Sequence, residues 1–326
     1  MLKVSSALVR LLVAVPLLTL ALPTVAQQGY PVKPVRFIVP FPPGGSADPM
    51  ARMAAQKLSD RWSQPVIVDN RGGGNTIIGS EAMVRSPADG YTILLVGTTH
   101  VANPSLLAHL PYDTLKDFDA VATIARSRFL LAVNAGVPAA TLQELIALAR
   151  AKEGQLSYAS SGEGSGPHLS AVLFEMMAGA KLQHIPYKGG AQSVTDLVSG
   201  RVQMIFANPG NVAVHVKSGK LKALAVTGAA RSAGLSQVPT FAEAGLPGYE
   251  MSGWYGVLAP ARTPKDIVEK IAADMAVILA MPDISDKLQS QGSEPFISTP
   301  DQFAGMIRSE VARYAKIVKA ANIKVE

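Results

Sequence analysis

The segment Val35–Asp48, which reads VRFIVPFPPGGSAD, carries the strongest structural signal in this chain. Its β-branched and aromatic start is typical of a short buried strand, and its Pro- and Gly-rich middle is typical of a loop. Asp48 and Pro49 then favour a helix, with Asp48 as N-cap and Pro49 at the first helical position. Apolar residues recur on one helical face at Met50, Ala54, Leu58 and Trp62. The segment therefore predicts a strand, a loop and a helix in direct succession.

Two further loops repeat this arrangement. Gly72–Thr76 follows the predicted strand Val66–Asp69, and Ser160–Pro167 follows the predicted strand Leu156–Ser160. Strands that lead directly into helices favour parallel sheets, in which ligands bind beyond the carboxyl ends of the strands. Helix N-termini at such places attract anions. The loops therefore predict anion binding, with tight turns of no further function as the alternative.

The composition describes a folded chain without metal or thiol chemistry. Of its 326 residues 48% are hydrophobic and 17% are charged, which favours globular structure, and the length favours two domains. Its lack of cysteine excludes disulfides, a thiolate metal site, a cysteine nucleophile and a lipid-modified N-terminal cysteine. We expect no metal, because no HxH or HxxxH spacing occurs among His100, His109, His168, His184 and His215. We also expect no cofactor, since neither GxGxxG nor Gly-Lys-Ser/Thr occurs.

Residues 1–26 have the pattern of an export signal. Lys3 and Arg10 are followed by the apolar run Leu11–Leu22 and by small residues that end at Ala26. A membrane anchor or a buried helix is the alternative, but the run falls short of the ~20 residues that span a bilayer. Removing the signal leaves 28 basic and 24 acidic residues, too even a balance to indicate nucleic-acid binding. We expect an exported protein without a lipid anchor.

The chain shows no Pro-rich linker between the expected domains. Leu130–Val133 and Leu221–Val226 are predicted strands that bracket a self-contained α/β block, so we expect the chain to cross between domains on strands there. This predicts domain I as residues 27–125 plus 226–326, and domain II as residues 126–225.

A secreted serine hydrolase is the enzyme alternative. Ser160, Ser161, Ser165 and His168 lie close together in the sequence, and Asp196 could complete a triad. The nucleophile-elbow signature GxSxG is absent, however. We therefore predict no catalytic residues, and interpret His168 as a hydrogen-bonding brace for its loop, with a ligand contact or a catalytic base as alternatives.

Several segments resemble the Bug family of periplasmic solute-binding proteins of tripartite tricarboxylate transporters. The resemblance is carried by Tyr30–Asp48, Val68–Asn75, Ala88–Thr92, Leu110–Asp113, Pro186–Gly190, Gly253–Gly256 and Ala259-Pro260. It implies a two-lobed α/β periplasmic-binding-protein fold (Venus flytrap, type II-like) with two crossing strands. It also implies a monomer that captures a small organic carboxylate between its lobes and delivers it to integral-membrane transporter subunits. A lobe that senses a ligand for a membrane signalling partner stays open as an alternative.

The resemblance, together with the Gly-rich loops, places the ligand between the loop from Phe41 and the loop from Ser160. The candidate ligand-binding residues are Phe41, Pro43, Gly44, Gly45, Ser46, Ala47, Asp48, Thr98, Thr99, Ser160, Ser161, Gly162, Gly164, Ser165, His168, Tyr187, Gly189, Ala207, Asn208 and Trp254. Trp254 is either a core residue or a wall of the cleft, and the same alternatives hold for Phe41.

The expected ligand is a carboxylate without an amine. A buried ammonium group needs a carboxylate or several acceptors close by. In the family, the strand that ends near residue 206 is commonly followed by an aspartate and then an asparagine. This chain has Ala207 and then Asn208 at these positions. Asp48 is expected to be used as a helix cap, and Glu163 lies at a loop tip.

Overall fold

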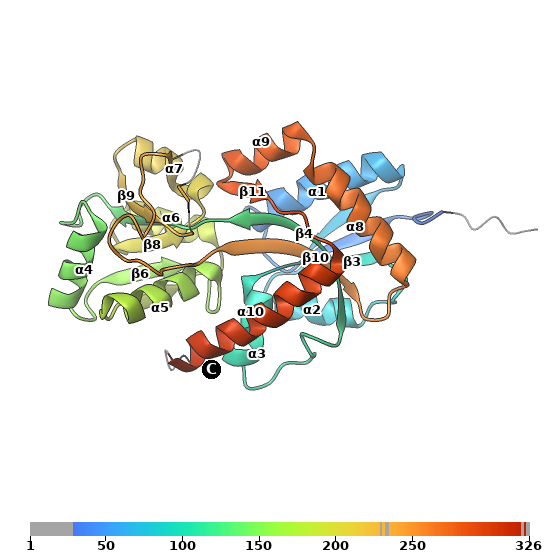
Figure 1. Cartoon of the computed structure of the whole chain (residues 1–326), viewed down its shortest axis with the longest axis horizontal. Helices are drawn as coiled ribbons and strands as arrows, with labels where there is room; N and C mark the ends of the chain where they lie inside the picture. The colour runs from blue at the N-terminus through green and yellow to red at the C-terminus, as the bar shows by residue number, and fades with distance from the viewer. Residues whose placement is uncertain (1–28, 229, 232–234, 321–322, 324–326) are drawn as a thin grey trace, which may run out of the picture.

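The structure, a computed structural model, consists of two lobes that lie side by side along the long axis of the molecule (Figure 1). It describes residues 29–228, 230–231, 235–320 and 323. The predicted export signal, residues 1–26, lies outside the described residues. Each lobe is built on its own sheet, one of six strands and one of five. Among the described residues, no helix is both long and apolar enough to cross a bilayer.

The first lobe is built on the six-stranded sheet. Its strands are β1 (Val35–Val39), β2 (Val66–Asn70), β3 (Thr92–Gly97), β4 (Phe118–Ser127), β10 (Gly253–Pro260) and β11 (Ser293–Pro295). They are arranged in the order β11-β4-β10-β3-β1-β2. β1 pairs in parallel with β2 and β3, whereas β10 is antiparallel to both β3 and β4. Phe37, Ile38 and Val39 of β1 are fully buried, as the apolar segment predicted.

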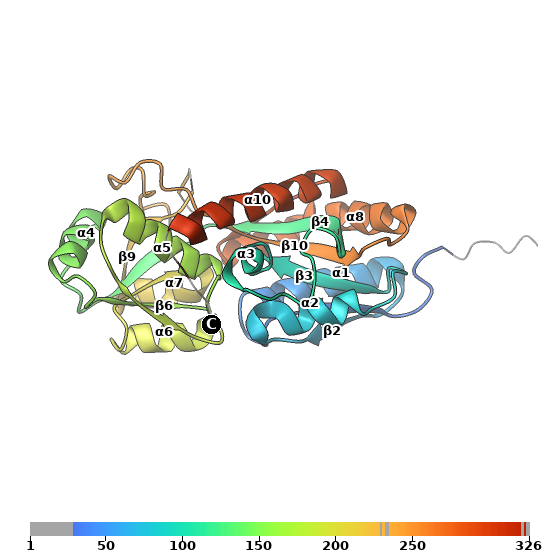
Figure 2. The same ribbon diagram turned by 90° about the horizontal axis from the view of Figure 1, so that it is seen from below.

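Helices cover both faces of this sheet. They are α1 (Ala47–Trp62), the short 3₁₀ helix η1 (Gly74–Thr76), α2 (Ile77–Val84), α3 (Thr98–Leu106), α8 (Lys265–Leu279), α9 (Pro282–Ser290) and α10 (Pro300–Ala320). Helix α10 packs on α3 and β4 through a stripe that includes Phe303, Ile307, Tyr314 and Val318 (Figure 2).

The second lobe is built on the five-stranded sheet. Its strands are β5 (Leu130–Asn134), β6 (Ser157–Ser160), β7 (Gln183–Pro186), β8 (Met204–Ala207) and β9 (Leu221–Val226). The order is β7-β6-β8-β5-β9, with β6 parallel to β7 and β8. Its helices are α4 (Leu142–Ala151), α5 (Gly166–Ala178), α6 (Gly190–Val198) and α7 (Pro209–Lys217). The two-lobed α/β fold expected from the sequence is thereby confirmed.

The chain crosses between the lobes at two places. The first crossing lies between β4 and β5, which are separated only by Arg128 and Phe129. The return crossing is predicted after residue 225. After β9 the chain stays with the second lobe, where the Phe241 N–H donates to the Val226 carbonyl and the Phe241 ring stacks on Tyr249, 3.9 Å between centroids. It rejoins the first sheet only at β10. The boundary after residue 225 stays a prediction, and this packing favours one near residue 252.

Local capping partly follows the sequence. Thr141 caps α4, since its Oγ1 accepts from the Glu144 N–H at 3.2 Å, which is the capping-box arrangement of a Thr-x-x-Glu sequence. For α1 the predicted cap is wrong: the N-cap is Ser46, and Asp48 lies inside the first turn. Asp48 does not act as the cap; its carboxylate instead accepts hydrogen bonds from Gly44, Arg52 and Asn70.

Candidate functional site

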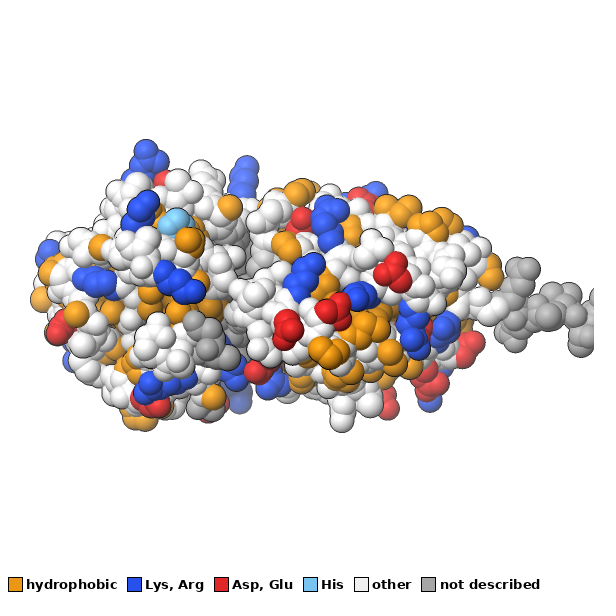
Figure 3. All heavy atoms as spheres, turned by 90° about the horizontal axis from the view of Figure 1, so that it is seen from above, with side chains coloured by type: hydrophobic (Ala, Val, Ile, Leu, Met, Phe, Trp, Pro, Cys, Tyr) orange, Lys and Arg blue, Asp and Glu red, His pale blue; other side chains and the backbone are white. Residues whose placement is uncertain are grey.

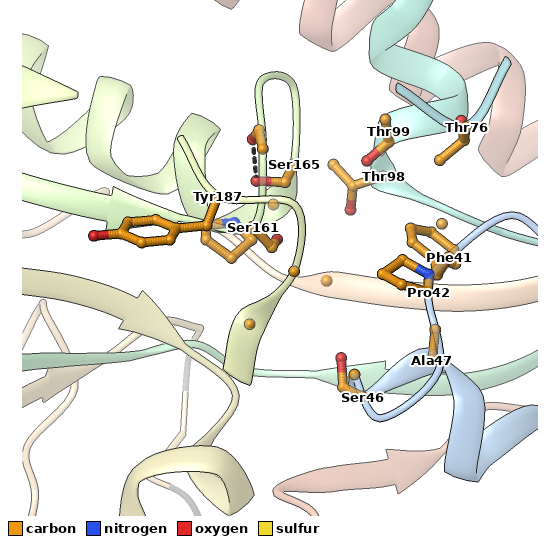
Figure 4. A pocket seen from close by; sticks show the side chains of 18 of the residues that line it. Phe41, Pro42, Ser46, Ala47, Thr76, Thr98, Thr99, Ser161, Ser165 and Tyr187 are labelled. Atoms are coloured by element: carbon orange, nitrogen blue, oxygen red, sulfur yellow. Dashed lines mark hydrogen bonds between the residues drawn. The ribbon is translucent and has the colours of Figure 1, made fainter. Parts of the chain in front are cut away.

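A cleft of about 990 Å³ separates the lobes and is lined by residues of both. In Figure 4, Ser46, Thr98 and Thr99 lie on the side of the first lobe, opposite Ser161 and Ser165 of the second. The cleft opens where three helices from each lobe begin. The N-cap residues of α1, α2, α3, α5, α6 and α7 all line it, and they are Ser46, Thr76, Gly97, Ser165, Gly189 and Asn208.

These helix N-termini leave backbone donors for a ligand. Of the six N-cap residues, only Ser165 accepts a hydrogen bond from its own first turn through its side chain, from the His168 N–H at 3.3 Å. First-turn N–H groups have no partner within the helix, and the helix dipole adds a partial positive charge there. The first turns of α2, α3, α5, α6 and α7 also contain no acidic residue. The cleft is therefore suited to an anion.

Asp48, the one acid in these first turns, braces the loop of the first lobe. Its carboxylate accepts from Arg52 Nε at 3.1 Å, from Asn70 Nδ2 at 3.0 Å and from the Gly44 N–H at 3.4 Å. Burial raises the pKa of Asp48, but these donors outweigh burial and hold that pKa below its usual value. Asn70 Nδ2 also donates to the Phe41 carbonyl at 3.2 Å. The charge of Asp48 is thus compensated beside the cleft, and the loop is fixed.

Aromatic side chains form the wall beside this loop. The ring of Phe41 meets Tyr255 edge to face, and the Tyr255 hydroxyl bonds Ser46 Oγ at 2.9 Å. Trp254 packs edge to face on Phe303 and is 4% exposed. It lines the cleft and also belongs to the core, so both interpretations of this residue hold.

The loop of the second lobe rests on two histidines. His168 Nδ1 accepts from the Gly164 N–H at 3.0 Å, and the His168 ring stacks on His184 with 4.1 Å between centroids. His184 Nε2 bonds Ser160 Oγ at 2.7 Å. Ser165 Oγ donates to the Gly162 carbonyl at 2.6 Å, which closes the turn. His168 therefore holds the loop in place through its bonds to Gly164 and Ser165 and does not line the cleft.

Lowering the pH is expected to destabilise the protein through these histidines. Burial, with a contribution from His184, lowers the pKa of His168 to about 3, and burial lowers the pKa of His184 to about 4. An unfolded histidine binds its proton near pH 6.5. Between these values the unfolded state binds more protons, so the free energy of unfolding falls as the pH is lowered from 6.5 toward 4. The melting temperature of His168→Gln should fall less between pH 7 and 4.5 than that of wild type; equal falls would contradict this origin.

The hydrolase arrangement does not form. Asp196 accepts from the Tyr187 hydroxyl at 2.8 Å and from Arg201 Nη1 at 3.0 Å, and so has another role. Ser165 Oγ donates to the Gly162 carbonyl and accepts from the His168 backbone N–H, and it makes no hydrogen bond to a histidine ring. The described residues also contain no group of three or more His, Asp or Glu side chains that could hold a metal ion.

Most of the predicted ligand-binding residues reach the cleft. Those that line it are Phe41, Pro43, Gly45, Ser46, Ala47, Thr98, Thr99, Ser161, Gly162, Ser165, Tyr187, Gly189, Ala207, Asn208 and Trp254. The Tyr187 ring points away from the cleft, toward Asp196, so this residue presents its backbone (Figure 4). Five predicted residues do not line the cleft: Gly44, Asp48, Ser160, Gly164 and His168.

Other lining residues were absent from the predicted set. The loop Gly72–Thr76, Asn70 and Ile77 line the cleft in the first lobe, and Glu163, Lys188 and Asn211 do so in the second. The Gly-rich loop after the second strand was the available signal for the first group. Lys188 and Asn211 carry no local pattern that separates them from ordinary surface residues.

Comparisons with known proteins agree with this geometry. Residues 50–323 match the family model described as "Tripartite tricarboxylate transporter family receptor". Protein BugT of Bordetella pertussis is 37% identical over 304 residues, which cover 93% of each chain. Among solved structures, Rpa4515 of R. palustris with adipate is 36% identical with a TM-score of 0.86, covering 91% of this chain and all of that one. MatC from Rhodopseudomonas palustris with bound malate is 28% identical with a TM-score of 0.82, covering 89% of this chain and all of that one.

The fold, the cleft and these matches lead to one family. Structures that share the fold include the periplasmic binding protein BugD, 30% identical with a TM-score of 0.84 over 91% of this chain and all of that one. The chain accordingly belongs to the tripartite tricarboxylate transporter receptor family, which includes the Bug proteins, and is a solute-binding receptor rather than an enzyme.

Proposed function

We propose that this chain captures a small organic carboxylate without an amine and delivers it to the integral-membrane subunits of a tripartite tricarboxylate-type transporter. The observation that carries the proposal is the convergence of helix N-termini from both lobes on one cleft. Backbone N–H groups bind carboxylate oxygens, and the helix dipoles favour the negative charge.

The charges around the cleft support a carboxylate over an amino acid. Among the described lining residues, Glu163 is the one acid and Lys188 the one lysine or arginine. Ala207 offers no carboxylate at the end of β8, and Asp48 is held by Arg52 and Asn70. An ammonium group would therefore have few partners here, and burying it unpaired is costly.

The walls of the cleft suit an apolar body. The apolar residues that line it include Phe41, Ile77, Leu107, Phe129 and Val194. Relatives with bound adipate and bound malate support the same ligand class. The proposed ligand is thus a carboxylate with an aliphatic or aromatic body.

We further propose that the protein works in the periplasm as a monomer, after removal of residues 1–26. The sequence pattern of an export signal supports this, as does the relation to periplasmic binding proteins such as BugD. Mass spectrometry of the protein from a periplasmic extract should find Gln27 as the first residue; a chain that retains Met1 would contradict removal of the signal.

Carboxylates are expected to bind more tightly than the matching amino acids. Isothermal titration should compare succinate with aspartate, and glutarate with glutamate, at one site per chain. We expect at least tenfold weaker binding of the amino acids, because one unpaired buried charge commonly costs more than the 1.4 kcal/mol that corresponds to tenfold. Consistently tighter binding of the amino acids would contradict the proposed ligand class and indicate Glu163 as the ammonium partner.

A further inference from the structure

The lobes also touch at a place outside the cleft. Pro209 and Gly210 begin α7 in the second lobe, and they face Gln291 and Gly292, which link α9 to β11 in the first lobe. These four residues do not line the cleft. Figure 1 shows α7 and α9 on the same side of the molecule, and Figure 3, seen from that side, shows the lobes meeting there. The contact is therefore independent of any ligand atom.

The approach at this contact is as close as glycine allows. A Cβ on residue 210 would lie 2.8 Å from Gln291 Cα and 2.9 Å from the Gln291 carbonyl carbon and oxygen. A Cβ on residue 292 would lie 2.6 Å from Pro209 Cδ. Because the obstructing atoms at Gln291 are backbone, no side-chain rotation relieves the overlap, and the lobes would have to separate.

The contact lies close to the crossing between the lobes. Gly292 directly precedes β11, whose Ser293 pairs with Ser127 at the end of β4. Pro209 follows β8, whose Ala207 pairs with Leu130 at the start of β5. Arg128 and Phe129 join β4 to β5. In a hinge-type closure, a displacement near the hinge produces a larger one at the far edge of the cleft.

From this geometry we infer that the Pro209-Gly210 and Gln291-Gly292 contact is a closure stop, which sets ligand affinity from outside the cleft. A glycine at position 210 lets α7 reach the backbone of Gln291, and any side chain there holds the lobes apart. The affinity part rests on the proposed function, because a ligand that needs both lobes binds only as well as the closed form is populated.

The variant Gly210→Ala tests this inference. Position 210 is the second residue of α7 and has no positive φ, so alanine favours the helix and the unliganded protein should fold with an unchanged or raised melting temperature. With succinate or adipate as probe, the Kd should rise roughly tenfold or more, since overpacking commonly costs that factor. The matched control is Gly305→Ala in α10, where the nearest atom is Arg308 Nη2 at 3.9 Å; its Kd should stay within twofold of wild type.

A distance measurement reads closure without depending on ligand identity. The chain has no cysteine, so spin labels at Met176→Cys in α5 and Val277→Cys in α8, both exposed, report the separation of the lobes. Double electron–electron resonance should show a population with a short label-to-label distance in the wild-type background. This population should shrink in Gly210→Ala, both with and without adipate.

The outcomes separate the two proposals. Failure of wild type to bind any carboxylate would refute the proposed function, and the label distances would then decide the closure stop alone. The closure stop is overturned if Gly210→Ala keeps the wild-type distances, or if it binds within twofold of a binding-competent wild type. A wild-type chain that never shows the short distance also overturns it, since the contact then does not form.

Discussion

Replacing Gly164 by alanine is expected to weaken ligand binding about 100-fold, the combined effect of backbone strain and overpacking. Gly164 has φ of +67°, which strains any other residue, and a Cβ there would lie 2.2 Å from Leu106 Cδ1 of the opposite lobe. Leu106 is buried, 4% exposed, so its side chain has little room to turn aside, and the loop is expected to move away from the first lobe and carry its ligand-facing N–H groups with it. Isothermal titration with the carboxylate that binds wild type most tightly measures the loss.

Two variants separate strain from overlap. Adding Leu106→Ala to Gly164→Ala removes the obstructing side chain and should recover about tenfold of the loss, the share expected from overpacking. Gly154→Ala places alanine at a similar φ of +70° with no atom within 4 Å and far from the cleft lining. It should change stability and leave the Kd unchanged. Binding by Gly164→Ala at wild-type affinity would show that this approach of the lobes is not needed for binding.

Removing the carboxylate of Asp274 is expected to produce a large loss of stability, about 3 kcal/mol, because it leaves the buried Trp62 Nε1–H without an acceptor and removes the partner of the half-exposed Arg61 and Lys270. Asp274 in α8 is 5% exposed and accepts from Trp62 Nε1 at 2.6 Å, Arg61 Nε at 2.5 Å and Lys270 Nζ at 2.9 Å. Burial raises the pKa of Asp274, but these three donors outweigh burial and hold it below its usual value. The Arg61–Asp274 ion pair and the Trp62 hydrogen bond link α8 to the end of α1.

Denaturant unfolding of Asp274→Ala measures this loss, with ligand affinity as a second measurement. The control is Asp283→Ala, which removes an exposed carboxylate from its pair with Lys57 and should change stability little. The Kd of Asp274→Ala should stay close to wild type, because this cluster lies outside the cleft. A loss of stability no greater than that of Asp283→Ala would show that Arg61 and Lys270 contribute nothing beyond a surface pair.

The sequence predicts best those elements whose partners are close along the chain. β1 and α1 are separated only by a short Pro- and Gly-rich loop. Their apolar residues and the composition of that loop predict all three elements. The bonds by which Thr141 caps α4 and Thr299 accepts from the Gln302 N–H at the start of α10 likewise act within one turn. Local signals of this kind also predicted the two Gly-rich loops, from Phe41 and from Ser160, that border the cleft.

Elements that depend on distant partners were not predicted. Helix α3 contains Pro104, which interrupts the helical pattern, and α3 is held by packing on α10. Strand β10 contains Gly253 and Gly256, poor strand formers, and its place between β3 and β4 stabilises it. The bond between Ser160 and His184 joins residues 24 positions apart, so no short motif could reveal it.

The convergence of helix N-termini separates two tasks that a binding site often assigns to the same side chains. In the proposed mode of binding, main-chain N–H groups hold the charge of the ligand, and every residue except proline supplies such a group. The length and width of a ligand that fits are set by side chains in the cleft walls, such as those of Phe41, Ile77 and Val194. A new ligand can therefore be acquired by substitutions in the walls while its anchoring is inherited unchanged. This gives the fold an evolutionary route to new nutrients through steps that each retain some binding.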